Sequence, residues 1–252
     1  MISTGQNECL RKVGDQAASQ ESWKDYAVYC RSRESGLRHQ AFQRLNNFLD
    51  TAISWSFHDR VSFVNWLCSR LYEFGESDGY GLIPQPLAER LIGPTLFEWA
   101  DREATDPRPC RWLGMFFSGV VYPAVRAGLI HSANDAFTYL REALRREPND
   151  QLARIRLIEM TVGNAEYSCH ELPHGYIGEP AEDLLGVEEA KQLLTGIVNP
   201  EQVTRLQSEL DHVSHLINDW ISFKNDGAVD FHEWCAKRGR KYRWIQAYSY
   251  VE

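Results

Sequence analysis

The stretch from residue 167 to residue 176, YSCHELPHGY, holds the densest group of side chains in this chain that could do chemistry. Cys169, His170, Glu171 and His174 lie within it. Thiol, imidazole and carboxylate groups bind zinc or iron, and they also serve as nucleophiles, general acids and general bases. Two interpretations compete for this stretch: a metal or catalytic site, and a polar turn that follows a helix.

The metal interpretation depends on the E-x-x-H spacing of Glu171 and His174, which Glu209 and His212 repeat. On a helix, residues three apart share a face, and di-iron bundle proteins use this spacing. The second pair lies in a clear helical pattern. Pro173 interrupts the first pair, because proline breaks the interior of a helix. The two further bridging glutamates of such a site are not singled out by any pattern, so the sequence predicts no metal and no cofactor.

The nucleophile interpretation would pair Cys169 with a histidine. Adjacent residues on a helix point about 100° apart, so Cys169 and His170 do not pair with one another. Buried cysteine is common in protein cores and is usually inert. The chain also lacks the P-loop, GxGxxG, GxSxG and HExxH motifs. We therefore predict no catalytic residues and a protein that is not an enzyme.

The remaining interpretation is a helix end followed by an ordered loop from Leu172 to Pro180. Loops on helical scaffolds carry contacts to partners. The predicted partner-binding residues are His170, Glu171, His174, Tyr176, Glu179, Glu182 and Asp183.

The net charge of −8 is unevenly distributed along the chain. Residues 163–219 contain eleven Asp and Glu against two Lys and Arg, whereas the whole chain has 35 and 27. Phosphate binding needs cationic surface, so this segment argues against a nucleic-acid ligand. It favours another protein with a basic surface as the partner.

The C-terminal tail has the opposite sign and is rich in aromatic residues. Such a mixture can stack on nucleic-acid bases, but we expect the tail to pack back onto the body with its cations facing water. The residues concerned are Lys237, Arg238, Arg240, Lys241, Arg243, Trp244, Tyr248 and Tyr250.

Length and composition indicate an ordinary globular chain of 252 residues. No apolar run approaches the roughly 18 residues that a membrane span needs, and the N-terminus lacks the apolar segment of a secretory signal. The six cysteines are scattered without a CxxC, as is typical of reduced thiols. We expect a soluble cytoplasmic protein without a membrane partner.

Helical periodicity dominates the chain. Leu37, Ala41, Leu45, Phe48, Leu49, Ala52 and Ile53 form one stripe, and a second helix begins at Ser56, where Asp59 completes a weak capping box. A loop follows at residues 75–86, Pro86 suits the first turn of the next helix, and Gly93-Pro94 should kink or split that helix.

The clearest helical signal runs from residue 199 to residue 224. Asn199 is the predicted N-cap, Pro200 occupies the first helical position and Gln202 is placed to close a capping box. Apolar residues follow at 203, 206, 210, 213, 217 and 220, which predicts a long helix packed on a neighbour. A short helix from Asp230 to about Gly239 comes next. Five tryptophans fall within helical patterns and are predicted to lie in the core: Trp66, Trp99, Trp112, Trp220 and Trp234.

These patterns predict an all-α fold of stacked antiparallel helix pairs, because no run alternates with a period of two. We expect a single helical domain over residues 1–252. The loop could divide it into N-terminal helices (1–80) and a helical-repeat body that ends in the long helix (81–252).

Two stretches, 96–113 and 140–157, match at an offset of 44 residues. In both, a helix ends in Arg-Glu, a short turn carries Pro and Asp, and a second helix follows. Periods of this size indicate stacked helix pairs. The matching pairs are Leu96 and Leu140, Glu98 and Glu142, Arg102 and Arg146, Glu103 and Glu147, Asp106 and Asp150, and Leu113 and Leu157.

The region that contains these two stretches resembles the tetratricopeptide-repeat family. Ala136, Leu140, Ala143 and Pro148 have the spacing of that family's second helix and terminal turn, and Trp112-Leu113-Gly114 is similar to the start of its first helix. The chain departs from the pattern because its Trp and Leu are adjacent. The resemblance covers about residues 94–165. It implies a protein-binding scaffold with no catalytic residues.

Three functions remain open on this basis. The first is a non-enzymatic binding protein with an acidic surface, of which an immunity protein against a bacterial toxin is a specific version. The second is a tetratricopeptide-type adaptor with a concave groove. The third is a metal-dependent enzyme that uses the E-x-x-H pairs, which metal analysis of the purified protein would separate from the other two.

Overall fold

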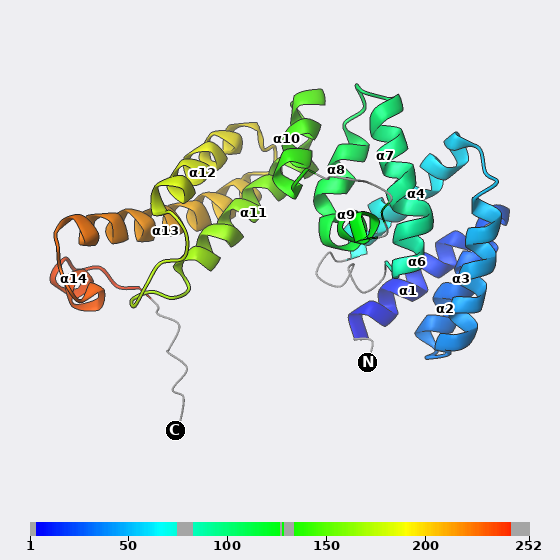
Figure 1. Ribbon diagram of the computed structural model, residues 1–252, viewed down its shortest axis with the longest axis horizontal. Helices are drawn as coiled ribbons and strands as arrows, with labels where there is room; N and C mark the ends of the chain where they lie inside the picture. Colours follow the sequence, from blue (N-terminus) through cyan, green and yellow to red (C-terminus); the bar gives the residue numbers. More distant parts are fainter. Residues whose placement is uncertain (1–3, 75–82, 127, 129–133, 243–252) are drawn as a thin grey trace. The chain divides into compact units, whose positions relative to one another are not determined.

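In the computed structural model, residues 4–74, 83–126, 128 and 134–242 are described, and all regular structure within them is helical (Figure 1). The predicted all-α class is therefore confirmed. No helix in the described ranges is both long and apolar enough to cross a membrane. The chain divides into two compact units, residues 1–148 and residues 149–252.

Unit 1 is built on helices that pack largely against their neighbours in sequence. The helix α2 contacts both α1 and α3, and α4 packs on α7. A 3₁₀ turn (Glu21–Trp23) and a π-helical turn (Ala88–Ile92) join some of the helices. The α-helices are α1 (Thr4–Ala17), α2 (Lys24–Glu34), α3 (Arg38–Ala52), α4 (Phe57–Phe74), α6 (Gln85–Leu87), α7 (Gly93–Arg102), α8 (Arg108–Met115), α9 (Phe117–Arg126) and α10 (Ala136–Arg146).

The boundary between the units differs from the subdivision at residues 80 and 81 that the sequence suggested. Helices on both sides of that point share one core, since α4 contacts α7 and α3 contacts the π turn. An ion pair joins Arg60 to Glu98 at 2.9 Å, and Trp112 Nε1 donates to Asn65 Oδ1 at 3.0 Å. Most of the predicted loop at 75–86 lies outside the described residues.

The predicted helix starts in unit 1 are confirmed, and one predicted stripe is too long. Ser56 Oγ accepts from Asp59 N at 3.1 Å and donates to Asp59 Oδ2 at 2.6 Å, so Ser56 caps α4 with one of the two bonds of the predicted capping box. In α3 the middle of the stripe is buried, but Leu37 and Ile53 are 49% and 64% exposed. These two residues flank the helix at its ends, where the chain leaves the packed face.

The Gly93-Pro94 pair lies where the π-helical turn gives way to α7, which confirms the predicted irregularity. A Cβ atom on Gly93 would lie 2.9 Å from the carbonyl oxygen of Ala88. Only glycine allows the backbone to approach this closely. Pro94 then occupies the first turn of α7, where its missing N–H costs no helical hydrogen bond.

The offset of 44 residues corresponds to matching local geometry at two helix ends. The backbone N–H of Glu103 bonds to Trp99 O after α7, and that of Glu147 bonds to Ala143 O after α10. The carboxylates that follow also match in role, because Asp106 accepts from Arg108 N and Asp150 accepts from Ala153 N. The four matched leucines, Leu96, Leu113, Leu140 and Leu157, are all buried.

Unit 2 consists of α11 (Gln151–Cys169), α12 (Pro180–Leu193), α13 (Pro200–Asn225) and α14 (Phe231–Lys237). The first three pack against one another around a common hydrophobic core (Figure 1). Asn199 Oδ1 accepts from the backbone N–H groups of Glu201 and Gln202 at 2.9 and 3.4 Å, so the predicted cap of α13 is confirmed. The predicted seam is buried at Leu206, Leu210, Val213, Ile217 and Trp220, and half-buried at Val203.

The tryptophans predicted to lie in the core do so, with one of them less buried than the rest. Trp99, Trp112, Trp220 and Trp234 are 5% exposed or less. Trp66 is half-buried and packs against the ring of Trp23, with centroids 4.7 Å apart.

Candidate functional site

The loop between α11 and α12 contains the residues that the sequence singled out. After α11 ends, a tight turn covers residues 170–174, in which the Leu172–Pro173 peptide bond is cis. His174 N and Gly175 N both bond to Glu171 O, at 2.9 and 3.1 Å. The predicted polar turn after a helix is therefore confirmed, and the first E-x-x-H pair lies in that turn and not in a helix.

Buried contacts hold this loop in one conformation. Leu172 is 3% exposed and belongs to the core of unit 2. The ring of Tyr176 stacks on Trp220 of α13, with centroids 6.4 Å apart, and the Tyr176 hydroxyl donates to Asp183 Oδ2 at 2.6 Å. At Gly178 the backbone has a φ of 83°, which favours glycine. The loop is thus anchored at several points along its length.

The acidic residues at the start of α12 have a local structural role. Glu179 is the N-cap residue, Pro180 is at the first helical position, and Glu182 and Asp183 lie in the first turn. Negative charge near a helix N-terminus is favourable because the backbone N–H groups there point outward. Asp183 is half-buried and accepts the Tyr176 hydroxyl, whereas Glu179 and Glu182 are exposed.

Cys169 is a core thiol, as predicted. It is 7% exposed, and burial, with a smaller contribution from the nearby Asp183 carboxylate, raises the pKa of this thiol to about 12. A thiol with such a pKa is protonated at neutral pH and is a poor nucleophile. All six cysteines of the chain are buried and none forms a disulfide.

The second E-x-x-H pair, Glu209 and His212, lies in α13, where each side chain contacts residues other than its partner in the pair. Glu209 pairs with Arg205 at 3.1 Å, and Arg205 also bonds to Glu159 of α11 at 2.7 Å. His212 is exposed, with its ring 6.3 Å from the ring of Tyr242. Over the ranges that the structure describes, no three His, Cys, Asp or Glu side chains lie together as a metal site would require.

Both cations of the acidic segment 163–219 are engaged by carboxylates. Arg205 bridges Glu159 and Glu209, as above. Lys191 Nζ lies 3.0 Å from Glu188 Oε1 and 3.4 Å from Asp211 Oδ1. The helices α11, α12 and α13 therefore share these charges across their packing faces, and the two cations neutralise part of the segment.

Five of the exposed glutamates of this segment have no Lys or Arg within ion-pair distance among the described residues. Glu171 has a histidine contact, with His170 Nε2 at 3.0 Å. Four of the five lie at the end of α11, in the loop or at the start of α12, and one lies in the first turn of α13. They are Glu166, Glu171, Glu179, Glu182 and Glu201.

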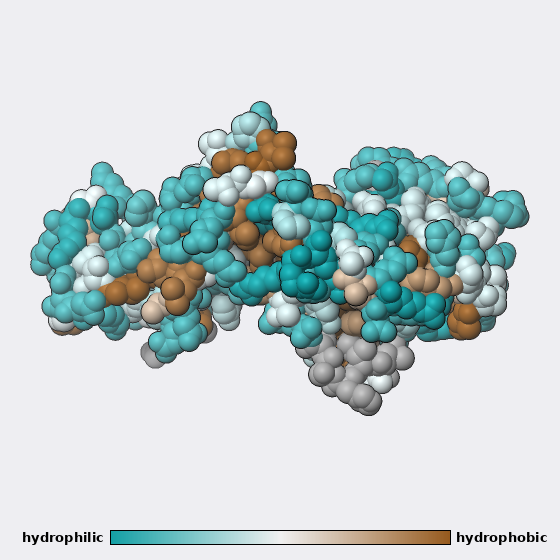
Figure 2. Space-filling model, turned by 90° about the horizontal axis from the view of Figure 1, so that it is seen from above, coloured by the Kyte–Doolittle hydropathy of each residue, from teal (hydrophilic) through white to brown (hydrophobic). Residues whose placement is uncertain are grey.

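Sequence reasoning missed two exposed residues near the loop. Tyr167 is 65% exposed and its ring packs 4.9 Å from that of His170, whose Nδ1 bonds to Tyr167 O. Leu185, on α12, is 73% exposed. The spacing of the buried residues Ile158, Val162, Ala165 and Cys169 would have placed Tyr167 outside the stripe of α11. Figure 2 shows hydrophobic side chains among hydrophilic ones over the helices of unit 2.

The basic residues near the C-terminus pair with carboxylates of their own unit. Lys237 lies 2.7 Å from Glu233, and Arg238 lies 2.8 Å from Asp226. Arg240 and the Tyr242 hydroxyl both bond to Asp219, which is 8% exposed. The tail packs back onto the body as far as residue 242, as predicted. Arg243, Trp244, Tyr248 and Tyr250 lie outside the described residues.

Comparisons of the chain with protein families, with curated proteins and with solved structures gave no match.

Proposed function

We propose that this chain is a non-enzymatic protein-binding protein that docks a basic partner through the surface around the loop between α11 and α12. The acidic docking surface consists of Glu166, Tyr167, His170, Glu171, His174, Glu179 and Glu182. Tyr176 and Asp183, also expected in the surface, support it from beneath through their mutual hydrogen bond.

The observation that carries the proposal is the distribution of paired and unpaired carboxylates. Lys191 and Arg205 are occupied by carboxylates between the helices, whereas the glutamates of the acidic docking surface have no Lys or Arg partner in the described chain. Like charges that gather on one surface repel one another unless a cation approaches. A basic partner would relieve that repulsion and would be attracted from a distance.

The loop is suited to binding because it is already ordered. The stacking of Tyr176 on Trp220 and the burial of Leu172 fix its conformation. Binding by a preorganised surface loses less conformational entropy than binding by a flexible one. Tyr167, exposed and packed against the ring of His170, supplies an aromatic side chain of the kind that anchors interfaces.

The specific form of the proposal is an immunity protein, acting in the cytoplasm, whose acidic surface blocks a basic groove of a bacterial toxin. An adaptor of the tetratricopeptide type is the second candidate. The close packing of α8 on α10 favours it, because a Cβ atom on Gly114 would lie 2.6 Å from Leu140 Cγ. Small residues at such crossings let paired helices approach closely, as in helical-repeat scaffolds.

The test starts from capture of the partner from the source cell and its identification by mass spectrometry. Glu179 and Glu182 are then changed to lysine, and Asp183 is kept because it accepts the Tyr176 hydroxyl. Glu201→Lys is the matched control, since it is also an exposed glutamate in a first helical turn but lies at the start of α13. Association and dissociation rates are measured at low and high salt.

We expect the double variant to slow association about tenfold at low salt, with dissociation changed less. The control should slow association less than about twofold. The proposal fails if the double variant associates as fast as the parent at both salt concentrations. A growth-rescue assay separates the two specific forms, because only an immunity protein protects cells that express its partner.

A further inference from the structure

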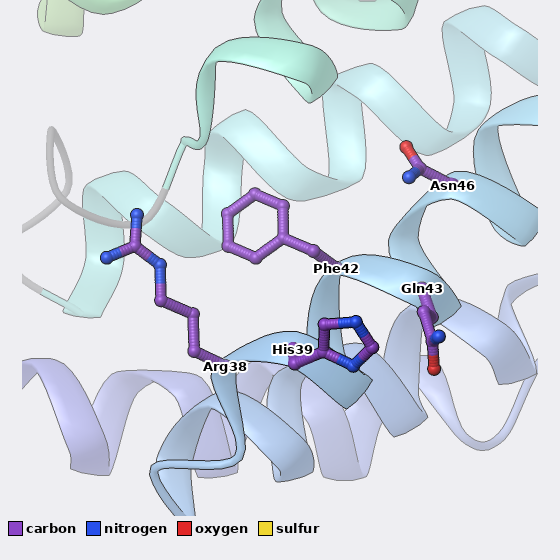
Figure 3. A pocket seen from close by; sticks show the side chains of 5 residues that line it. All are labelled: Arg38, His39, Phe42, Gln43 and Asn46. Carbon is purple, nitrogen blue, oxygen red and sulfur yellow. The ribbon is translucent and has the colours of Figure 1, made fainter.

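The outer face of α3 in unit 1 carries a second feature that the proposed function does not use. One side of this helix is buried in the core through Ala41, Leu45 and Phe48. The other side lines a cavity of about 570 Å³ (Figure 3). Its described lining residues, at helical spacing, are Arg38, His39, Phe42, Gln43 and Asn46.

The apolar part of this cavity is centred on Phe42. The ring is half-buried and packs edge-on against Tyr29, with centroids 6.2 Å apart. In Figure 3 the Phe42 ring and the Arg38 side chain project to the same side of α3. The guanidinium carbons of Arg33 and Arg38 lie 5.6 and 5.8 Å from the centre of the ring. The aromatic ring is thus flanked by two cations.

Arg33 and Arg38 differ from two other arginines nearby, which pair with carboxylates. Arg31 pairs with Asp15 at 3.3 Å, and Arg44 pairs with Asp25 at 3.6 Å. Arg33 and Arg38 have no carboxylate within ion-pair distance in the part of the chain that is described. His39 adds a further ionisable group to the lining. The cavity therefore combines an aromatic ring with two cations that no carboxylate of the described residues pairs with.

We propose that this cavity docks an acidic peptide segment of a partner protein. An aromatic or aliphatic side chain of the peptide packs on Phe42, and carboxylates on either side of it bind Arg33 and Arg38. The planar guanidinium group matches a carboxylate with two parallel hydrogen bonds. This peptide segment is acidic, so it is distinct from the basic surface that we propose binds to the acidic docking surface.

The test uses a fluorescein-labelled peptide of sequence Glu-Glu-Phe-Glu-Glu, blocked at its C-terminus, and the full chain. Fluorescence anisotropy gives its affinity, and amide chemical shifts of the isotope-labelled protein map its position. Two further probes replace the central Phe with Ser or all four Glu with Lys. The variants are Arg38→Gln and Phe42→Ala, with Arg44→Gln as the matched control, because Arg44 lies on α3 but is paired with Asp25.

We expect saturable binding with shifts concentrated at residues 38–46. Arg38→Gln and Phe42→Ala should each weaken binding at least about fivefold, and Arg44→Gln less than about twofold. The Phe42→Ala variant could disturb the packing on Tyr29 and so weaken binding indirectly. Arg38 is exposed, so Arg38→Gln should leave the fold intact and still tests the proposal.

Three outcomes would overturn the proposal. The Ser-containing or Lys-containing peptide could bind as tightly as the original one, which would leave the apolar or the charged part of the cavity without a role. Arg44→Gln could weaken binding as much as Arg38→Gln does. Light scattering could reveal a dimer that Arg38→Gln dissociates and the acidic peptide does not, and a second copy of the chain would then be the occupant.

Discussion

The guanidinium group of Arg146, at the end of α10, donates to the carbonyl oxygen of Asp106 at 3.0 Å, and Asp106 lies in the turn between α7 and α8. The same group reaches the carbonyl oxygens of Ala100 and Glu103 at 3.3 and 3.4 Å. The Arg146 side chain is only 9% exposed. A single cation therefore satisfies the carbonyl groups at the end of α7 and holds α10 against it.

Replacing Arg146 with methionine should destabilise the protein by about 2–3 kcal/mol, because a charged donor loses its hydrogen bonds to three backbone carbonyl groups, two of them part-buried. Arg102→Met is the matched control. Arg102 occupies the equivalent position 44 residues earlier, but its side chain is 58% exposed and pairs with Glu98. The control should cost less than about 1 kcal/mol. Chemical denaturation measures both, and equal losses would show that the bonds from Arg146 to the backbone carbonyl groups contribute little.

Glu142 should make stability depend on pH in a defined acidic window. Its hydrogen bonds with Arg145 and Arg146 lower the pKa of this carboxyl group from 4.5 to about 2. A lowered folded-state pKa means that the carboxylate stabilises the fold above about pH 4.5, and that this contribution is lost as the pH falls through about 2. Glu142→Gln should therefore cost about 1 kcal/mol at pH 7.

The measurement is the difference in unfolding free energy between parent and Glu142→Gln, followed from pH 7 to pH 2. It should stay constant down to about pH 5 and then shrink. A difference that does not change with pH would contradict the assigned role of the two arginines.

Gly114 should tolerate no side chain, in contrast to a glycine elsewhere in a helix. A Cβ atom at Gly114 would lie 2.6 Å from Leu140 Cγ and 3.0 Å from Ala136 O, so α8 and α10 would have to move apart. Gly114→Ala should therefore lower stability by about 1–3 kcal/mol. Gly163→Ala in α11 is the control, because its Cβ meets nothing within 4 Å. It should raise stability by about 0.5–1 kcal/mol, since alanine favours a helix over glycine. Melting temperatures that shift in the same direction for both variants would contradict the interpretation that α8 and α10 are too close at Gly114 to admit a side chain.

Leu210→Asp should be among the most damaging substitutions in unit 2. Leu210 is fully buried in the middle of the α13 seam, and the change places an unpaired charge among hydrophobic side chains. We expect a loss of more than about 3 kcal/mol. Ser208→Asp, at an exposed position two residues earlier, should change stability by less than about 0.5 kcal/mol. Thermal unfolding followed by circular dichroism checks both, and a parent-like transition for Leu210→Asp would mean that the seam is not packed.

The all-helical class and several helix ends could be predicted from the amino-acid sequence alone. The caps at Asn199 and Ser56 and the irregularity at Gly93 are all predicted from residues no more than a few positions apart. Such features depend on bonds between near neighbours, so the local sequence contains the information needed to predict them. The polar turn after α11 belongs to the same class, because Pro173 prevents the helix from continuing.

The neutralised charges and the boundary between the two units, in contrast, become visible only in the folded chain. Arg205 reaches Glu159 across 46 residues, Lys191 reaches Asp211 from another helix, and Arg146 of α10 donates to the backbone carbonyl oxygen of Asp106. Each of these pairings depends on the register in which two helices pack, and helical periodicity specifies the packed face but not that register. The acidic segment counted in the sequence is therefore partly self-neutralised, and a smaller set of exposed glutamates has no Lys or Arg within ion-pair distance among the described residues.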